Sequence, residues 1–188
     1  KCIESWNKFP AGIRSAFYVA WDPQSYFSLK RNIRNLNLIM PEWFFIDPKT
    51  DELKTNVDPQ GFSLMKKSGI PIMPMLSNNF DREFRPEAIG RILHSEKKRK
   101  KMIFQVLAQC LRNKFVGINI DFEDLNESSD QYLIQFVKEI SAAFHSKGLL
   151  VTQDIMPFND DYNIKELAKY NDYLFLMAYD EYSSGSDP

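Results

Sequence analysis

The stretch VGINIDFED, residues 116–124, decides how the rest of the sequence is read. Asn119, Asp121 and Glu123 alternate with apolar residues in it. On a β-strand these three polar side chains would share one face, spaced about 6–7 Å apart. Burial of an uncompensated carboxylate costs several kcal/mol. The row therefore indicates either an exposed edge strand or a functional site.

Composition limits the class of protein. The chain has 188 residues and a formal net charge of −1, which predicts a single domain with a sizeable core and no nucleic-acid partner. No apolar run approaches the roughly 20 residues of a membrane span. The cysteines, Cys2 and Cys110, and the histidines, His94 and His145, lack metal-ligand spacing. We therefore expect no disulfide framework and no metal site.

Apolar runs alternate with helical patterns along the whole chain. The predicted strands are 13–21, 36–46, 70–76, 115–123, 149–156 and 173–179, and Pro41 predicts a bulge or bend in the second of them. The predicted helices are 24–35, 58–67, 86–113 with a second start at Ser95, a segment between capping residues Ser128 and Gly148, and 164–170. This alternation is typical of parallel strands covered by helices, in an open doubly wound sheet or a β/α barrel. No glycine-rich phosphate fingerprint follows the first strand, which favours the barrel.

Polar residues gather where the predicted strands end. Parallel strands point the same way, so these residues converge on one rim, where β/α barrels build their sites. A buried hydrogen-bonded network is the structural alternative. The residues are Asp22, Asn78, Asp121, Glu123, Gln153, Asp154, Tyr179 and Asp180.

Glu123 is the best candidate for a general acid, because it ends its strand where a side chain can reach a ligand. Asp121 lies two residues earlier on the same face, and a nearby like charge raises a carboxyl pKa toward the range that acid catalysis needs. Asn119 can donate a hydrogen bond to Asp121, and Tyr179 supplies a hydroxyl group at the same rim.

Two motifs carry a family resemblance. The stretch GINIDFE, residues 117–123, resembles the fourth-strand signature DGxDxDxE of the family-18 glycoside hydrolases, which are chitinase-like β/α barrels. The stretch MAYD, residues 177–180, is similar to the sixth-strand motif MxYD of that family. The resemblance implies that residues 1–188 form one catalytic-type domain of the (β/α)8 TIM-barrel class. We count only the first six β/α units, as in a barrel truncated at its C-terminus.

The resemblance also implies a reaction, the retaining and substrate-assisted hydrolysis of β-linked N-acetylglucosamine polymers. Glu123 would act as acid and base, and Asp121 and Tyr179 would hold the acetamido group of the substrate. No metal or cofactor is needed. The residues expected to contact the polysaccharide are Asn119, Tyr18, Trp21, Trp43, Asn78, Asp154, Met177 and Asp180.

The sequence departs from the family signature at Val116 and Asn119, where the family has Asp. An asparagine cannot share a proton with Asp121. Two alternatives to a hydrolase therefore stand: a non-hydrolytic glycan-binding barrel that assists polysaccharide synthesis or modification, and an inert scaffold.

Three further stretches are similar to the family-18 domain of large bacterial proteins that also carry a polysaccharide deacetylase and a glycosyltransferase. They are WDPQS at 21–25, PEWFF at 41–45 and IDFE at 120–123. This likeness implies neighbouring domains of those two kinds and a location outside the cytoplasmic membrane. Open sheet edges in a six-stranded piece would favour an oligomer that covers them.

Overall fold

The computed structural model describes residues 9, 12–125, 130–156 and 162–177 of the chain. Its main sheet has six parallel strands that lie side by side in chain order. They are β1 (Ser15–Tyr18), β2 (Leu38–Ile46), β4 (Met75–Ser77), β7 (Gly117–Asp121), β8 (Leu150–Ile155) and β9 (Tyr173–Leu176). All six predicted strands are confirmed, and the acidic stretch lies on β7, in the middle of the sheet.

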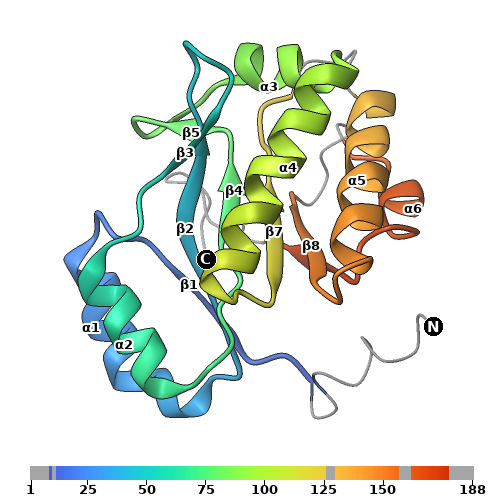
Figure 1. Cartoon of the computed structure of the whole chain (residues 1–188). Coiled ribbons are helices and arrows are strands. Elements are labelled where there is room, and N and C mark those ends of the chain that lie inside the picture. Colours follow the sequence, from blue (N-terminus) through green and yellow to red (C-terminus); the bar gives the residue numbers. More distant parts are fainter. Residues whose placement is uncertain (1–8, 10–11, 126–129, 157–161, 178–188) are drawn as a thin grey trace, which may run out of the picture.

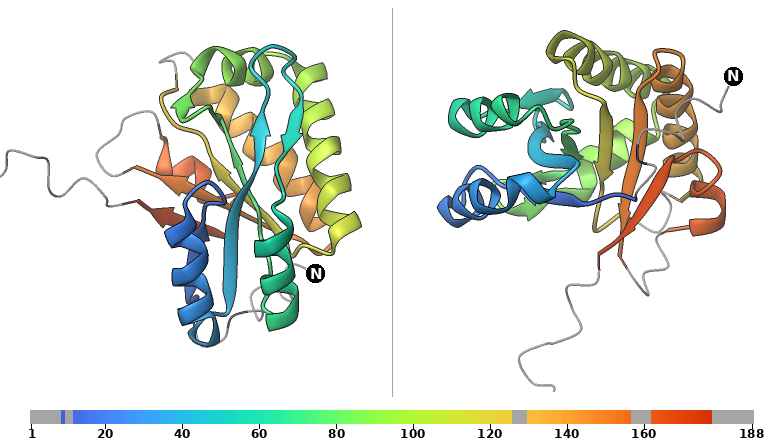
Figure 2. Two further views of the ribbon diagram at one scale, coloured as in Figure 1. Left: turned by 90° about the vertical axis from the view of Figure 1, so that its left-hand side faces the viewer. Right: turned by 90° about the horizontal axis from the view of Figure 1, so that it is seen from below.

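The sheet curls, as the view from below in Figure 2 shows. Its two ends approach one another closely enough that the ring centroids of Phe17 on β1 and Phe175 on β9 are 6.4 Å apart. The architecture is a half-barrel of parallel strands with helices outside it, which confirms the predicted β/α barrel class with six units present.

Helices cover the outside of this curled sheet (Figures 1 and 2). They are α1 (Pro23–Asn32), α2 (Pro59–Ser68), α3 (Pro86–Leu93), α4 (Glu96–Asn113), α5 (Asp130–His145) and α6 (Ile164–Leu167), and a 3₁₀ turn, η2 (Ile33–Asn35), follows α1. Side chains of Asp22, Asp58 and Ser95 accept hydrogen bonds from the first turns of α1, α2 and α4, so the predicted second start at Ser95 is confirmed. The predicted cap at Ser128 lies outside the described residues. None of the helices described is long and apolar enough to cross a membrane.

Apolar side chains form two layers, one on each face of the sheet. The inner layer fills the curl below the rim and consists of Leu38, Met40, Met73, Met75 and Leu150, with Phe17 and Phe175 packed against it. The outer layer is larger and joins the sheet to the helices through residues such as Phe44, Leu76, Ile118, Ile120 and Phe136. Along β7 the outward side chains are therefore apolar, and the inward ones at 119 and 121 belong to the site.

A bulge in β2 follows Pro41, as the sequence predicts. Glu42 pairs with Met75 of β4, but the next pairs are Phe44 with Leu76 and Phe45 with Ser77. Trp43 is therefore an extra residue in β2. Since Met75 and Ser77 face inward, the bulge directs both Glu42 and Phe45 toward the inside of the curl although they are three residues apart.

Three short strands at the rim were not predicted from the sequence. β3 (Leu53–Thr55) pairs antiparallel with β2, and β5 (Asn79–Phe80) forms a hairpin with β6 (Glu83–Phe84). The hairpin turns through Asp81 and Arg82, both with positive φ (54° and 67°). Such a turn normally carries Asn or Gly, so the Asp-Arg sequence gives no turn signal.

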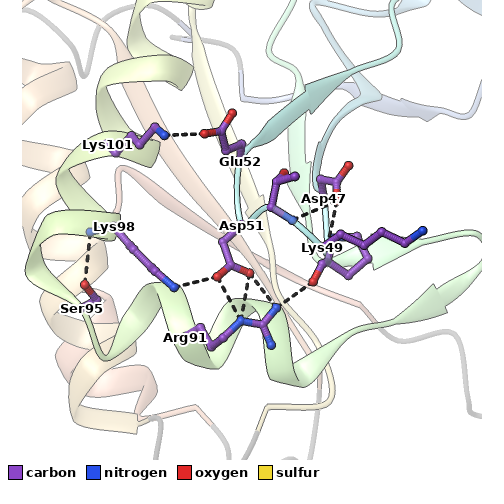
Figure 3. A network of polar contacts seen from close by, with 10 residues as sticks. Asp47, Lys49, Asp51, Glu52, Arg91, Ser95, Lys98 and Lys101 are labelled. Carbon is purple, nitrogen blue, oxygen red and sulfur yellow. Dashed lines mark hydrogen bonds and ion pairs between the residues drawn. The ribbon is translucent and has the colours of Figure 1, made fainter.

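An ion-pair network fixes the loop between β2 and β3 to the helices (Figure 3). Asp51 accepts hydrogen bonds from Arg91 of α3 at 2.7 Å and from Lys98 of α4 at 2.8 Å, and Glu52 pairs with Lys101. Lys98 and Lys101 of α4 thus bind the acidic loop, whereas Arg99 between them pairs with Glu139 of α5. The network holds β3 against β2, at the rim where the site lies.

Candidate active site

Asn119 is completely buried on β7 and links two neighbouring side chains of β8. Its Nδ2 donates to Oδ2 of Asp154 at 2.7 Å, and its Oδ1 accepts from the hydroxyl group of Thr152 at 2.6 Å. Both the nitrogen and the oxygen of the side-chain amide of Asn119 are therefore hydrogen-bonded within the protein. Asn119 orients Asp154, whereas the sequence analysis expected it to orient Asp121.

Asp121 lies one step closer to the rim and is 7% exposed. Burial raises its pKa to about 6, although side-chain hydrogen bonds with Ser77 and Glu123 act in the opposite direction. A hydrogen bond between two carboxyl groups requires a proton on one of them. Asp121 and Glu123 thus form a hydrogen-bonded pair of carboxyl groups in which burial raises the pKa of Asp121.

Glu123 follows the end of β7, and Asn78 holds its backbone in place. Oδ1 of Asn78 accepts from the amide of Glu123 at 2.9 Å, and its Nδ2 donates to the carbonyl group of Glu123 at 2.8 Å. The hydroxyl group of Tyr162 donates to the carbonyl oxygen of Phe122 at 2.7 Å. Asn78 is completely buried and its amide is engaged on both sides, and its predicted contact with substrate stays a prediction. It positions Glu123.

Asp154 is also buried, with 3% of its surface exposed. Its pKa is raised by burial and by the negative charge of Asp121, and Glu123 adds to the effect. It lies beneath the rim, where its charge interacts with that of Asp121. The predicted contact of Asp154 with substrate stays a prediction.

Glu42 is the acidic residue that the sequence analysis missed as a site residue. It is partly buried on β2, and burial together with the charge of Asp121 raises its pKa to about 7. A side-chain hydrogen bond from Trp21 lowers the pKa in part. A charged residue in the otherwise apolar run IMPEWFFI, residues 39–46, was the available signal.

An open cavity of about 660 Å³ lies at the rim, and Glu42 is the member of this acidic group that lines it. Trp21, Phe45 and Phe80 supply aromatic surface to its wall, and Glu42 is the acidic group that joins the wall to Asp121. Trp21 is 61% exposed, and the guanidinium group of Arg82 lies 5.3 Å from the centre of its ring. The other lining residues are Lys54, Thr55, Asn56, Asn79 and Asp81. An aromatic wall with convergent polar groups suits a sugar chain.

Tyr18 and Trp43 do not reach this cleft. Trp43 is completely buried, and its indole donates to Asp58 at 2.9 Å; the hydroxyl group of Tyr18 donates to the same carboxylate at 2.9 Å. The predicted stacking of these two residues on sugars is wrong. The bulge turns Trp43 outward, and both residues anchor Asp58, the N-cap of α2.

Of the three remaining predicted residues, the structure describes Met177. Met177 is buried directly after β9, with its amide donating to Ile155 of β8 at 2.9 Å. Tyr179 and Asp180 lie outside the described residues. Within the described part of the chain, no group of three or more His, Cys, Asp or Glu residues is arranged to hold a metal ion.

Comparison with known proteins identifies the family. The sequence pattern described as Glycosyl hydrolases family 18 matches residues 46–188. The chain belongs to glycosyl hydrolase family 18. It is also 24% identical over 182 residues to the uncharacterized glycosylase YvbX of Bacillus subtilis, covering 91% of this chain and 53% of that protein. The chain thus spans about half the length of this relative.

Solved structures share the fold. A chitinase from Chromobacterium violaceum superposes with a TM-score of 0.82 at 22% identity, over 95% of this chain and 59% of that one. The spore cortex-lytic enzyme SleL of Bacillus cereus gives a TM-score of 0.82 at 16% identity, over 94% and 43% of the two chains. At these identities the likeness shows the family-18 barrel fold.

Proposed function

We propose that the chain carries the acid/base half of a retaining, substrate-assisted glycoside hydrolase that acts on β-linked N-acetylglucosamine polymers. One observation carries the proposal: Asp121 and Glu123 form a hydrogen-bonded carboxyl pair at the carboxyl end of β7, on the rim where an aromatic cleft opens at Glu42. Family membership supports the reaction class. The names chitinase and cortex-lytic enzyme among its structural relatives support a chitin-like or peptidoglycan-like glycan.

In the proposed reaction Glu123 gives its proton to the glycosidic oxygen as the bond from that oxygen to the anomeric carbon breaks. The acetamido oxygen of the substrate bonds to the anomeric carbon in its place, and Asp121 stabilises the positive charge that develops on the acetamido group. Glu123, now a carboxylate, removes a proton from water as the water attacks the anomeric carbon, and the bond from that carbon to the acetamido oxygen breaks. The two displacements retain the anomeric configuration.

The two hydrogen bonds between the side chain of Asn78 and the backbone of Glu123 serve this reaction by fixing the backbone position of Glu123 after β7. Two hydrogen bonds to the backbone of a single residue leave its side chain as the main remaining freedom. A general acid must lie within hydrogen-bond reach of the leaving oxygen. The constraint on the backbone of Glu123 therefore helps to position the carboxyl group for proton transfer.

The decisive experiment measures the release of reducing ends from chito-oligosaccharides and peptidoglycan fragments by the protein that contains this chain. Glu123→Gln keeps the shape of the side chain but removes the acid, and the rate should fall by at least 10²-fold with oligosaccharide binding retained. Asp124→Asn, at the exposed neighbouring residue, is the matched control and should retain activity. Unchanged hydrolysis in Glu123→Gln, or glycan binding by the wild type without turnover, would overturn the proposal and favour a binding module.

The proposed polymer is a cell-envelope or extracellular material. We therefore propose that the protein acts outside the cytoplasmic membrane. Cell fractionation, with the protein found only in the cytoplasm as the contrary result, tests this location.

A further inference from the structure

Three polar side chains lie next to one another on the inner face of the sheet. Ser77 of β4 and Asp121 of β7 are partners in the parallel ladder. In the next ladder Ile120 pairs with Gln153, so the residues that follow, Asp121 and Asp154, are neighbours as well. Adjacent strands lie about 4.8 Å apart, which brings the side chains of such neighbours within reach of one another. Asp121 therefore has a hydroxyl group on one side and a second carboxyl group on the other.

Hydrogen bonds determine which oxygen atom of Asp154 lacks a partner. The hydroxyl group of Thr152 donates to Oδ1 of Asn119 at 2.6 Å, which orients the amide so that its Nδ2 donates to Oδ2 of Asp154 at 2.7 Å. Oδ1 of Asp154 has no hydrogen-bond partner in the described part of the chain, although only 3% of the residue is exposed. A buried polar atom without a partner costs free energy, so this oxygen atom needs an explanation.

The surroundings of Asp154 disfavour a negative charge on it. β7 contributes the acidic Asp121 and, beyond the end of the strand, Glu123, whereas β9 contributes the uncharged Phe175, the ladder partner of Asp154. None of the ion pairs among the described residues includes Asp154. Burial, and then the charge of Asp121, raise the pKa of Asp154 well above the usual range of an aspartate. A proton on Oδ1 would remove the charge and convert the unpartnered oxygen atom into a donor.

We propose that Asp154 is a positioning residue of the hydrolytic site, which stays a neutral carboxylic acid and donates a hydrogen bond from Oδ1 to Asp121. Ser77 hydrogen-bonds to Asp121 from the opposite side, so donors from both neighbouring strands hold Asp121 as a carboxylate. This inference rests on the proposed function, in which Asp121 stabilises a positive charge on the acetamido group and must therefore be ionised. Asn119 contributes by donating to Oδ2 of Asp154, which leaves Oδ1 for the proton.

The first test follows protonation directly, by carbon-13 NMR of the aspartate carboxyl groups in the protein that contains this chain. The signal of Asp154 should keep the shift of the acid form while Asp121 ionises with a midpoint of about 6. Asp154→Asn retains a neutral donor and should leave the midpoint of Asp121 within about 0.3 pH units, whereas Asp154→Ala removes the donor and should raise it by about 0.5 units or more. If Asp154 were ionised, both variants would lower the midpoint, because a like charge would be lost. That result, or no change in either variant, overturns the inference.

The second test is the pH profile of kcat. Because the reaction needs ionised Asp121, Asp154→Ala should lose at least about threefold in kcat at pH 5.5 and less at pH 7.5, while Asp154→Asn stays within about twofold of the wild type at both. A loss of the same size at every pH in Asp154→Ala would assign Asp154 a structural role only and overturn the inference. Asp124→Asn, at an exposed residue, serves as the matched control. If the titrations give the expected result but the protein hydrolyses no glycan, the proposed function fails while the hydrogen bond from Asp154 to Asp121 stands.

Discussion

Asn119 donates a hydrogen bond from Nδ2 to Oδ2 of Asp154 across 2.7 Å, joining the middle strand of the sheet to β8 beneath the rim. The asparagine that departs from the family signature thus has a definite partner. Asp154 has a raised pKa, and a neutral amide beside it avoids adding another negative charge to the buried acids. Where the family signature has Asp, this chain has Asn119, and its side chain hydrogen-bonds to the carboxyl group of Asp154.

The Asn119 contacts predict a loss of stability on truncation. Asn119→Ala leaves Asp154 and Thr152 without their partner, and each orphaned buried group should lower the free energy of unfolding by about 1–3 kcal/mol. Urea denaturation measures the change. The control Asn32→Ala, at an exposed residue with a single bond to the carbonyl group of Ser28, should change stability little. Equal effects in the two variants would show that the buried bridge contributes nothing special.

The raised pKa values predict how stability depends on pH. Asp121 and Glu42 hold their protons more tightly in the folded chain than in the unfolded chain, with folded pKa values of about 6 and about 7. The native state therefore binds more protons between about pH 4 and 7, and stability must fall as pH rises through that window. In the double variant Asp121→Asn/Glu42→Gln this fall should be smaller, as measured by the unfolding free energy at pH 4, 5.5 and 7.

Asp51 serves as a control for that experiment, because its contribution to stability should depend on pH in the opposite direction. Hydrogen bonds from Arg91 and Lys98 lower its pKa, so its contribution is present at neutral pH and lost as pH falls through the folded value. Asp51→Asn should thus reduce stability at pH 7, and this effect should shrink as the carboxylate of the wild type is protonated in acid. For the double variant Asp121→Asn/Glu42→Gln, a steeper fall of the unfolding free energy with rising pH than in the wild type would contradict the raised pKa values of Asp121 and Glu42.

The same network should hold the rim loop in place. Asp51→Ala removes contacts to Arg91 and Lys98, both partly exposed, so we expect a loss of about 1 kcal/mol at low salt and less at high salt. Hydrogen exchange of the β3 amides should accelerate as well, because β3 follows this loop. Lys100→Ala, which removes a fully exposed pair with Glu96, should leave both measurements unchanged.

Adding a single methyl group at Gly117 should lower the stability of the fold strongly. An added Cβ would lie 2.1 Å from the carbonyl oxygen of Leu150, which is backbone of the neighbouring strand and cannot move aside. Gly117→Ala should destabilise the fold by about 3 kcal/mol or more, since overpacking against a fixed backbone exceeds the usual range. Gly69→Ala is the comparison: its Cβ meets nothing, and only the left-handed φ of 71° opposes it, at about 1–2 kcal/mol. Thermal unfolding should rank the two variants in that order.

The six strands and the main helices could be predicted because their signals are local. Apolar runs, the caps Asp22, Asp58 and Ser95, and the Pro41 bulge are properties of a few adjacent residues. β3 and the β5–β6 hairpin could not be predicted, since they are short, polar and held by contacts with β2 and the ion-pair network. The Asp-Arg turn of the hairpin carries no residue that favours positive φ strongly.

For the site, the sequence by itself determined that Asp121 and Glu123 lie together at the end of a central strand, because two residues of spacing place both on one face. Only the tertiary structure decided which other groups join them. It brings Glu42 to the cleft from β2, turns Phe45 inward through a bulge, assigns Asn78 to the backbone of Glu123, and places Trp43 in the outer layer. The physical reason is that these roles depend on register and bulges between strands distant in sequence, where a shift of one residue reverses the face of a side chain.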